Sequence, residues 1–348
     1  MKDKIRWGVL GAGGIADRRT IPGLMLADNA VLLGVMEVDM DTACRLREKY
    51  GAEKAYDRVE DLLRDEHIDA VYIASPVAFH REQAMMAAEM GKHILLEKPL
   101  GLTADEGQEV VDHCARHRVS LAAGFMMRFH AYHREMRKYV MEGRLGDLVC
   151  ARAQLTCWYP DIPGSWRQAM ATSGGGALMD MGIHCLDLIQ HISGHRTRLV
   201  AGMASTLTFE YEVEDTGAIL LELDNGAICH VESNFNIPDD AAKCRLEFYG
   251  TKGSMLAEGT IGQVEGGSLE VTFDEEARGY DAAQDRLENR TRKVEVALGN
   301  MYKKEIESFG ESILQNSPLE VPATDAVQVQ RVIEAAYKSS RTKTFVRL

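Results

Sequence analysis

Over the first 124 residues, short apolar runs alternate with longer stretches whose apolar positions recur at helical spacing. Buried strands are predicted for the apolar runs at 5–11, 30–36, 68–74, 92–96 and 119–123. Helices are predicted for the amphipathic stretches at 41–50, 59–64, 80–90 and 104–117. Strands that alternate with helices are typical of βαβ units, which form a parallel sheet with right-handed crossovers. We therefore expect residues 1–124 to form an α/β domain with a doubly wound parallel sheet.

After about residue 125, strand signals dominate. A helix is predicted at 132–142, and strands are predicted at 148–158, 200–210, 218–223, 227–236 and 245–249. Asn225-Gly226 favours a hairpin between two of these strands, because both residues accept the positive φ angles of a type I′ turn. Closing helices are predicted at 301–314 and 325–339. Residues 125–348 should form an α+β domain with a large, mainly antiparallel open sheet, and the C-terminal helix is expected to pack back on the first domain.

Composition and charge restrict the classes of protein to which the chain can belong. A length of 348 residues fits two domains, and 45% hydrophobic residues suffice for two cores. The net charge of −13 disfavours nucleic-acid and anionic-membrane partners, and no apolar run reaches the roughly 18 residues of a membrane span. Seven scattered cysteines without a C-x-x-C pair are typical of reduced thiols in a cytoplasmic protein. The charged stretch 275–292 is expected to form solvated loops or edge strands without a function.

A glycine pattern, G-x-G-x-x-A, closes the first predicted strand. Gly11 allows a tight turn, Gly13 lets the backbone approach a pyrophosphate, and Ala16 lets the next helix pack close to the strand. The N-terminus of that helix offers unpaired N–H groups and a partial positive charge to phosphates. Glu37, at the carboxyl end of the second strand, is placed to accept hydrogen bonds from a ribose. An ordinary βα turn would explain the glycines but not the acid, so the pattern predicts a dinucleotide site.

Glu97-Lys98-Pro99 ends another predicted strand of the same domain. Ligands of open parallel sheets bind beyond the carboxyl ends of the strands, which is where Lys98 lies. Pro99 favours an extended Lys98 and so limits the positions that the ammonium can take. The alternative is a surface lysine before a turn.

A glycine turn at 173–176 opens a predicted helix that carries chemically useful side chains. Asp180, His184 and Asp187 are spaced i, i+4 and i+7, which places them on one helix face. A carboxylate one turn from an imidazole can orient the ring and raise its basicity, as a general base requires. The alternatives are a capped helix with a satisfied polar face, or a metal site. We expect no metal, because the chain has no H-E-x-x-H and its other histidines lack ligand spacing to His184.

Four motifs, in this order along the chain, resemble those of the Gfo/Idh/MocA oxidoreductase family. They are G-x-G-x-x-A, residues 69–76 with His80, residues 91–93 leading into Glu97-Lys98-Pro99, and Gly175-Gly176 followed by Asp180-x-Gly182-x-His184-x-x-Asp187. The segments 249–254 and 333–340 also resemble the family, so the similarity spans nearly the whole chain. The resemblance implies a Rossmann domain followed by an open-sheet α/β domain. It also implies a nicotinamide dinucleotide and the reversible oxidation of a sugar or cyclitol hydroxyl.

The resemblance also suggests roles for individual residues. Lys98, Asp180 and His184 match the family's catalytic lysine, aspartate and histidine. The positions that match residues around the cofactor are Gly11, Gly13, Gly14, Ile15, Glu37, Ser75, Pro76, His80, Glu97 and Lys98. The candidate substrate contacts are Arg128, Trp166, Arg167, Asp180 and His184. For Trp166-Arg167 the alternative is packing or an interface, and for Arg128 it is a buried structural pair.

The expected activity is that of an NAD-dependent dehydrogenase of a sugar, glycoside or cyclitol. His184 would take the hydroxyl proton, and Lys98 would stabilise the negative charge that develops on the oxygen. Glu37 is followed by Val38 rather than by Arg or Ser, which favours NAD over NADP because nothing there would bind a 2′-phosphate. Two alternatives remain: a glycosidase or epimerase that retains NAD, and a non-catalytic regulatory protein that binds the cofactor. A homo-oligomer, a dimer or tetramer formed through the second-domain sheet, is expected.

Overall fold

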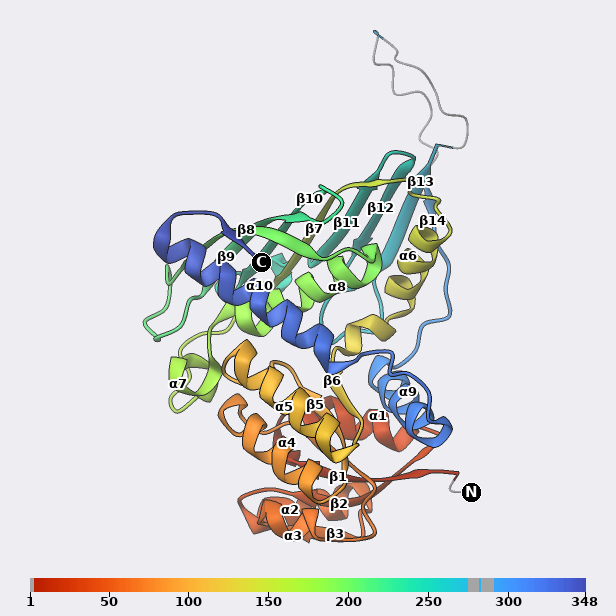
Figure 1. Cartoon of the computed structure of the whole chain (residues 1–348), viewed down its shortest axis with the longest axis vertical. Coiled ribbons are helices and arrows are strands. Elements are labelled where there is room, and N and C mark those ends of the chain that lie inside the picture. Colours follow the sequence, from red (N-terminus) through yellow and green to blue (C-terminus); the bar gives the residue numbers. More distant parts are fainter. Residues whose placement is uncertain (1–2, 275–281, 283–290) are drawn as a thin grey trace.

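The apolar runs of the N-terminal part form one parallel sheet (Figure 1). The structure, a computed structural model, describes residues 3–274, 282 and 291–348. Within these residues the first sheet has six strands in the order β3-β2-β1-β4-β5-β6. The strands are β1 (Ile5–Leu10), β2 (Ala30–Met36), β3 (Lys54–Tyr56), β4 (Ala70–Ile73), β5 (His93–Glu97) and β6 (Leu121–Gly124). All neighbouring strands pair in parallel, so the prediction of a doubly wound sheet is confirmed.

Five helices cover this sheet among the described residues. Four of them lie where the amphipathic stretches predicted them, and the helix at Ile21–Leu26 was not predicted. The five helices are α1 (Ile21–Leu26), α2 (Met40–Tyr50), α3 (Val59–Leu63), α4 (His80–Glu89) and α5 (Ala104–His117). The segment after β1 is a wide π-type turn, η1 (Ala12–Thr20), rather than a regular α-helix. Sequence reasoning missed β3, because a strand of three residues is too short to show a periodic pattern.

A second, mixed sheet follows a crossover formed by η3 (Met126–Phe129) and α6 (Ala131–Met141). Within the described residues it has nine strands, in the order β14-β13-β12-β11-β7-β10-β9-β8-β15. They are β7 (Leu148–Thr156), β8 (Thr197–Ser205), β9 (Thr216–Leu223), β10 (Ile228–Asn234), β11 (Arg245–Gly250), β12 (Gly253–Glu258), β13 (Ser268–Phe273), β14 (Arg292–Lys293) and β15 (Val346–Arg347). Only β7 and β10 pair in parallel among these strands, so the predicted mainly antiparallel character is confirmed.

Several strand predictions in this half differ from the structure. The strand predicted at 200–210 ends at Ser205, because the amides of Leu207, Thr208 and Phe209 donate to the Asp215 carboxylate rather than to another strand. β12 and β13 were not predicted. The predicted hairpin between β9 and β10 is present, but its turn is not the expected type I′, because Gly226 has a positive φ of 87° and Asn225 does not have a positive φ. The charged stretch 275–292 lies almost entirely outside the described residues.

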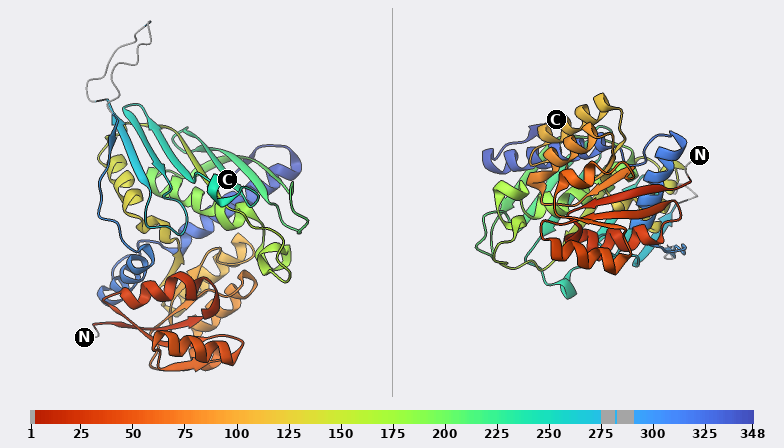
Figure 2. Two further views of the ribbon diagram at one scale, coloured as in Figure 1. Left: turned by 180° about the vertical axis from the view of Figure 1, so that it is seen from behind. Right: turned by 90° about the horizontal axis from the view of Figure 1, so that it is seen from below.

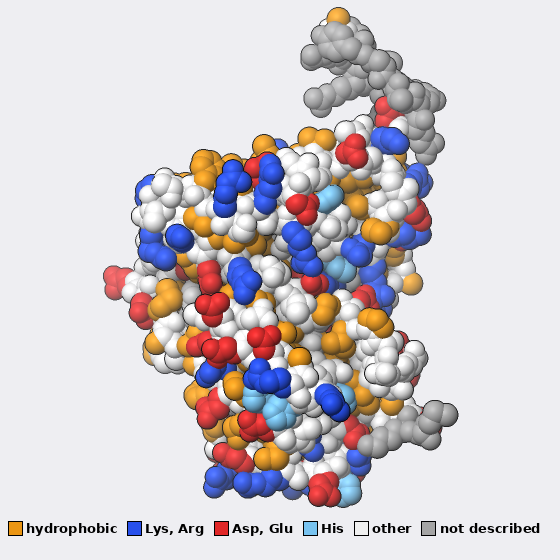
Figure 3. Space-filling view, in the orientation of Figure 1, with side chains coloured by type: hydrophobic (Ala, Val, Ile, Leu, Met, Phe, Trp, Pro, Cys, Tyr) orange, Lys and Arg blue, Asp and Glu red, His pale blue; other side chains and the backbone are white. Residues whose placement is uncertain are grey.

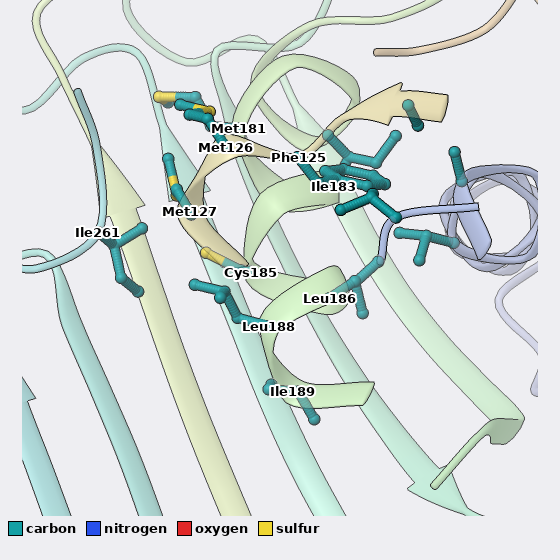
Figure 4. Packing of buried hydrophobic residues seen from close by; sticks show 14 of the residues in the cluster. Phe125, Met126, Met127, Met181, Ile183, Cys185, Leu186, Leu188, Ile189 and Ile261 are labelled. Carbon is teal, nitrogen blue, oxygen red and sulfur yellow. The ribbon is translucent and has the colours of Figure 1, made fainter. Parts of the chain in front are cut away.

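Helices pack on one face of the second sheet and link it to the first (Figures 1 and 2). α8 (Ile183–Ser193) lies across the strands, with Phe125, Met126 and Met127 packed beside its first turns (Figure 4). The C-terminal helices return to the N-terminal part. α9 (Met301–Gln315) packs on α1, and α10 (Ala323–Thr342) packs on both α5 and β8. Gln330 of α10 donates to the carbonyl of Gly101 at 2.9 Å.

The surface and the thiols complete the description. Acidic and basic side chains are interspersed on the face shown in Figure 3. In the described part of the chain, no helix is both long enough and apolar enough to cross a membrane. All seven cysteines lie within the described residues and are free thiols.

Candidate active site

The glycine turn after β1 lies against the end of β4. Gly11 has a φ of 71°, and a Cβ on it would come within 2.6 Å of the Ser75 amide nitrogen, so the contact requires glycine. A Cβ on Gly14, in contrast, would meet nothing within 4 Å, so the backbone there borders open space. Exposed backbone at the first turn of a helix is the geometry that holds a pyrophosphate. The residues present therefore fit a dinucleotide.

Glu37 follows β2 and lies beside this turn. Its Oε1 accepts a hydrogen bond from the Gly13 amide. The next residue, Val38, is 84% exposed, and Asp39 caps α2 by accepting from Thr42. The three residues that follow β2, from 37 to 39, thus present two carboxylates and no cation. This arrangement suits ribose hydroxyl groups and opposes a phosphate.

The turns after β4 and β5 are joined by the buried ring of His80. Its Nδ1 lies 2.8 Å from the carbonyl oxygen of Pro99, and its Nε2 lies 2.8 Å from that of Ser75. Burial lowers the pKa of His80. Ser75 itself donates to Gln83 at 2.7 Å, and Pro76 begins the short turn that leads into α4. His80 therefore joins the loop that precedes α4 to the loop that contains Lys98.

Glu97 is the last residue of β5 and is partly buried beside Lys98. It accepts hydrogen bonds from the Tyr72 hydroxyl and from the Lys98 amide, the latter at 3.2 Å. Burial raises the pKa of Glu97, and the Lys98 ammonium opposes that rise. A Cβ on Gly124 would press on the Glu97 carboxyl at 3.1 Å, so the end of β6 helps to fix this side chain.

Lys98 and Asp180 meet across the gap between the two sheets. The Lys98 ammonium donates to the Asp180 carbonyl at 2.7 Å and to its carboxylate at 2.8 Å. Arg167 lies 3.8 Å from the other carboxylate oxygen. Burial by itself would raise the pKa of Asp180, but the charges of Lys98 and Arg167 hold it below its usual range. The ammonium is therefore fixed in place by a carboxylate that stays ionised.

His184 lies one turn after Asp180, at the start of α8. Its ring packs edge-on against Phe125 with the centroids 5.8 Å apart. Within the described part of the chain, its buried Nδ1 has no hydrogen-bond partner. Burial and the Lys98 charge lower the pKa of His184 well below 6.5, and Asp180 only partly offsets them. The ring is therefore neutral at physiological pH, which is the form that accepts a proton.

The structure separates Asp187 from this pair. The residues from Leu178 to Gly182 form a π-turn, η5, whose wider spacing interrupts the regular helical face that the sequence predicted. Asp187 is 1% exposed and accepts from Arg128, which also lies 3.0 Å from Asp325. Arg128 is 3% exposed, which places it in the buried structural pair that the sequence analysis kept as its alternative.

A cavity of 620 Å³ lies between the two sheets and brings most of the predicted residues together. Those that line it are Ile15, Ser75, His80, Glu97, Lys98, Trp166, Arg167, Asp180 and His184. The other predicted residues, all of them described, do not line it: Gly11, Gly13, Gly14, Glu37, Pro76 and Arg128. The glycines, Glu37 and Pro76 border the ends of β1, β2 and β4 instead. Arg167 stacks over the Trp166 ring at 4.3 Å, so these two side chains form one wall.

Sequence reasoning missed several residues of this cavity. Arg18 and Arg19 line it from η1, and their position directly after the glycine pattern could have indicated them. Tyr302 lines it from α9, and within the described residues its buried hydroxyl has no partner. Asp239 follows β10. Nothing in the sequence near Tyr302 or Asp239 indicates that the chain returns to this site.

Comparison with known families decides the classification. Residues 5–125 match the model of the oxidoreductase family with an NAD-binding Rossmann fold, and residues 133–256 match the GFO/IDH/MocA C-terminal domain. The chain belongs to the GFO/IDH/MocA oxidoreductase family. It is thus an NAD(P)-dependent oxidoreductase, and the family and cofactor class implied by its motifs are confirmed.

Individual members of the family are similar along the whole chain. D-xylose 1-dehydrogenase (NADP(+)) 2 of Haloferax volcanii is 28% identical over 345 residues, which cover 98% of this chain and 99% of that protein. Myo-inositol 2-dehydrogenase of Thermotoga maritima is 27% identical, with 99% and 98% covered. The crystal structure of aldose-aldose oxidoreductase from Caulobacter crescentus superposes with a TM-score of 0.89 at 24% identity, with 99% and 100% covered, and shows the same fold.

Proposed function

We propose that this protein is a dehydrogenase that transfers hydride from a sugar, glycoside or cyclitol hydroxyl carbon to NAD. The observation that carries the proposal is the placement of a fixed ammonium, Lys98, next to a neutral imidazole, His184, in the cavity beyond β5. The names of the relatives from H. volcanii and T. maritima, a xylose and an inositol dehydrogenase, support this class of substrate.

Each side chain then has one task. The alcohol loses its O–H proton to His184, while its C–H electron pair leaves as hydride. The Lys98 ammonium donates to the same oxygen and stabilises the negative charge that grows on it. Asp180 holds that ammonium in place. The nicotinamide dinucleotide, when bound, accepts the hydride.

The cofactor is held by the glycine turn and the neighbouring strand ends in this proposal. Its binding residues are Gly11, Gly13, Gly14, Ile15, Glu37, Ser75, Pro76, His80, Glu97 and Lys98. The carboxylate of Glu37, beside the Gly13 amide, supports NAD rather than NADP, because it would repel a 2′-phosphate. Trp166 and Arg167 contribute the sugar-binding wall together with Asp180 and His184.

The domain boundary and the assembly belong to the same proposal. Residues 1–124 bind the dinucleotide, and residues 125–348 bind the substrate and mediate assembly into a cytoplasmic dimer or tetramer. Leu220 and Ile228, which are 46% and 57% exposed on the face of the second sheet opposite α8, support such an interface. Sedimentation of the wild type and of Ile228→Glu tests it, and a monomeric wild type would contradict it.

A substrate screen tests the proposed reaction. The protein is incubated with NAD or NADP and a panel of aldoses, glycosides, anhydrosugars and inositols, and the formation of reduced cofactor is followed. At least one compound should reduce NAD, and it should do so with a higher kcat/KM than it reduces NADP. Absence of cofactor reduction across the panel would contradict the proposal.

A further inference from the structure

Glu214 is a buried carboxylate outside every motif discussed so far. It lies just before β9 and is 7% exposed. Its Oε2 accepts from the Gly176 amide at 2.8 Å, and its Oε1 accepts from the Leu178 amide at 2.9 Å and from the Tyr337 hydroxyl at 2.7 Å. The Ala177 amide donates to the carbonyl of Glu214 at 3.0 Å. One residue thus binds three consecutive amides of the glycine turn.

The glycines of that turn make room for these contacts. A Cβ on Gly176 would overlap the carbonyl oxygen of Glu214, and a Cβ on Gly175 would overlap the hydroxyl of Tyr337. Any side chain at either position would push Glu214 or Tyr337 away. The Gly175-Gly176 pair and the closing segment with Tyr337 therefore belong to one construction, although 160 residues separate them in the sequence.

The backbone that Glu214 contacts is connected directly to the residues proposed to react. The Asp180 amide donates to the carbonyl of Gly176 at 2.8 Å, and the π-turn η5 begins at Leu178, whose amide Glu214 holds. Asp180 fixes the Lys98 ammonium, and His184 follows one turn later. The amides at the start of a helix have no partners within the helix, so an acceptor there stabilises that turn. Burial raises the pKa of Glu214, and the bonds from Tyr337, Leu178 and Gly176 oppose that rise.

We propose that Glu214 is a positioning residue: through its bonds to Gly176 and Leu178 it sets the π-turn that carries Asp180 and leads into the first turn of α8, where His184 lies. Tyr337 holds the Glu214 carboxylate in the orientation that this task requires. The inference rests on the proposed function, because its effect on rate is measured through that reaction. Its effect on the turn itself can be measured without any substrate.

Glu214→Gln tests the inference, because a carboxamide keeps the size but places an NH₂ group against one of the two amides. We expect kcat to fall by about tenfold to a hundredfold, because a shifted turn moves Asp180 and His184 out of the geometry that the reaction requires. The Kd for NAD should change much less than kcat, because Glu214 makes its hydrogen bonds to none of the residues proposed to bind the cofactor. The midpoint of the pH dependence of kcat, which His184 governs, should move to higher pH. A looser turn admits water to the buried ring that faces Lys98 and Asp180, and water reduces the lowering of its pKa by burial.

Two further variants separate positioning from stability. Ser339→Ala removes a buried hydroxyl of the same helix as Tyr337, one that accepts from Gly202 and donates to Thr344, but it leaves the glycine turn untouched. It should lower the melting temperature without moving the pH midpoint. Tyr337→Phe removes a single neutral donor. It should fold, lower kcat by a smaller factor than Glu214→Gln, and move the midpoint in the same direction.

Amide hydrogen exchange of the peptide that covers 174–184 provides the readout that needs no substrate. Exchange should become faster in Glu214→Gln and Tyr337→Phe, and stay unchanged in Ser339→Ala. A wild type without dehydrogenase activity would refute the proposed function, while the exchange data would still decide the role of Glu214. Unchanged exchange, or a kcat and pH midpoint in Glu214→Gln that match those of Ser339→Ala, would overturn the inference.

Discussion

At the scale of single residues, the pair of Lys98 and Asp180 does more for geometry than for stability. Both partners are largely removed from water, and the cost of their desolvation offsets much of their attraction. What the pair provides is an ammonium that cannot move, because it donates both to the carbonyl and to the carboxylate of Asp180. A fixed charge needs no reorganisation when negative charge develops on the substrate oxygen.

Lys98→Met removes this charge and keeps the volume of the side chain. We expect kcat to fall by about a thousandfold or more, because one electrostatic donor to a developing oxyanion contributes on that scale. Binding of NAD should remain detectable by fluorescence titration. Lys54→Met, which breaks an ion pair with Asp65 away from the cavity, is the control and should retain wild-type turnover. Turnover near the wild-type level in Lys98→Met would exclude the catalytic role.

His184→Ala should flatten the rising limb of the pH profile of alcohol oxidation. Burial holds the pKa of His184 below 6.5, so the base is already unprotonated at neutral pH, and in the wild type the limb should lie below pH 6.5. His195→Ala, at a histidine paired with Asp224 on the surface, should leave the profile unchanged. If the limb keeps its shape and position in His184→Ala, another group is the base.

The sequence singled out these residues as candidates but did not predict how they pair. Regular helical spacing favoured Asp180 as the partner of His184, whereas the structure pairs Asp180 with Lys98. Two features of the fold cause this difference, and neither can be read from local spacing. The π-turn widens the spacing between the side chains, and Lys98 comes from the other sheet. The role of Glu214 was also beyond sequence reasoning, because an acid before a strand usually lies in solvent.

At the scale of elements, the proposed preference for NAD over NADP rests on the end of β2. Glu37 lies beside the glycine turn and accepts from the Gly13 amide, so a phosphate on the ribose would meet a carboxylate there. Val38 is exposed and free of packing constraints that would oppose a longer side chain.

Glu37→Ser combined with Val38→Arg should therefore shift preference toward NADP. The repulsion disappears and a cation becomes available, so the ratio of kcat/KM for the two cofactors should move by at least about 1 kcal/mol, the scale of one charge-assisted hydrogen bond. Val38→Arg alone keeps the carboxylate and should move the ratio less. A wild type that already prefers NADP, or an unmoved ratio in the double variant, would show that Glu37 does not face the ribose.

The elements differ in how far the sequence predicts them. In the first sheet, buried parallel strands leave continuous apolar runs, and five of the six described strands were located from them. In the second sheet, the strand predicted at β8 extended too far, because the amides of the residues after β8 donate hydrogen bonds to the carboxylate of Asp215. An interaction of this kind, between residues six to eight positions apart, leaves no periodic signal.

At the scale of the whole molecule, the C-terminal helices hold the two sheets together. Periodicity predicted that α9 and α10 each have an apolar face, but it could not identify the surfaces that they cover. α9 brings Tyr302 against α1, where a Cβ on Gly23 would come within 2.7 Å of it. The cavity is therefore enclosed by segments from both ends of the chain.

Buried neutral histidines should make the whole fold sensitive to acid. Burial lowers the pKa of His133 to about 3, while its ring nitrogens contact Met127 and Thr260. The unfolded chain binds a proton at pH 6.5 and the folded chain does not, so the free energy of unfolding falls as pH drops below 6.5. Each such histidine contributes up to about 1.4 kcal/mol per pH unit until its folded pKa is reached.

Urea unfolding at several pH values between 6.5 and about 5 checks this expectation. His133→Gln should show a shallower loss of stability in that window than the wild type. Equal slopes in the two proteins would mean that His133 is protonated in the fold.

The central claim is that hydride leaves the substrate for the dinucleotide in each turnover. The most direct measurement quantifies NADH and oxidised product in the same reaction, with the best substrate from the panel and excess NAD. We predict one NADH for each molecule of ketone or lactone formed, and neither in Lys98→Met. Substrate consumed without accumulation of NADH would contradict this account and indicate an enzyme that retains its cofactor and returns the hydride to the product.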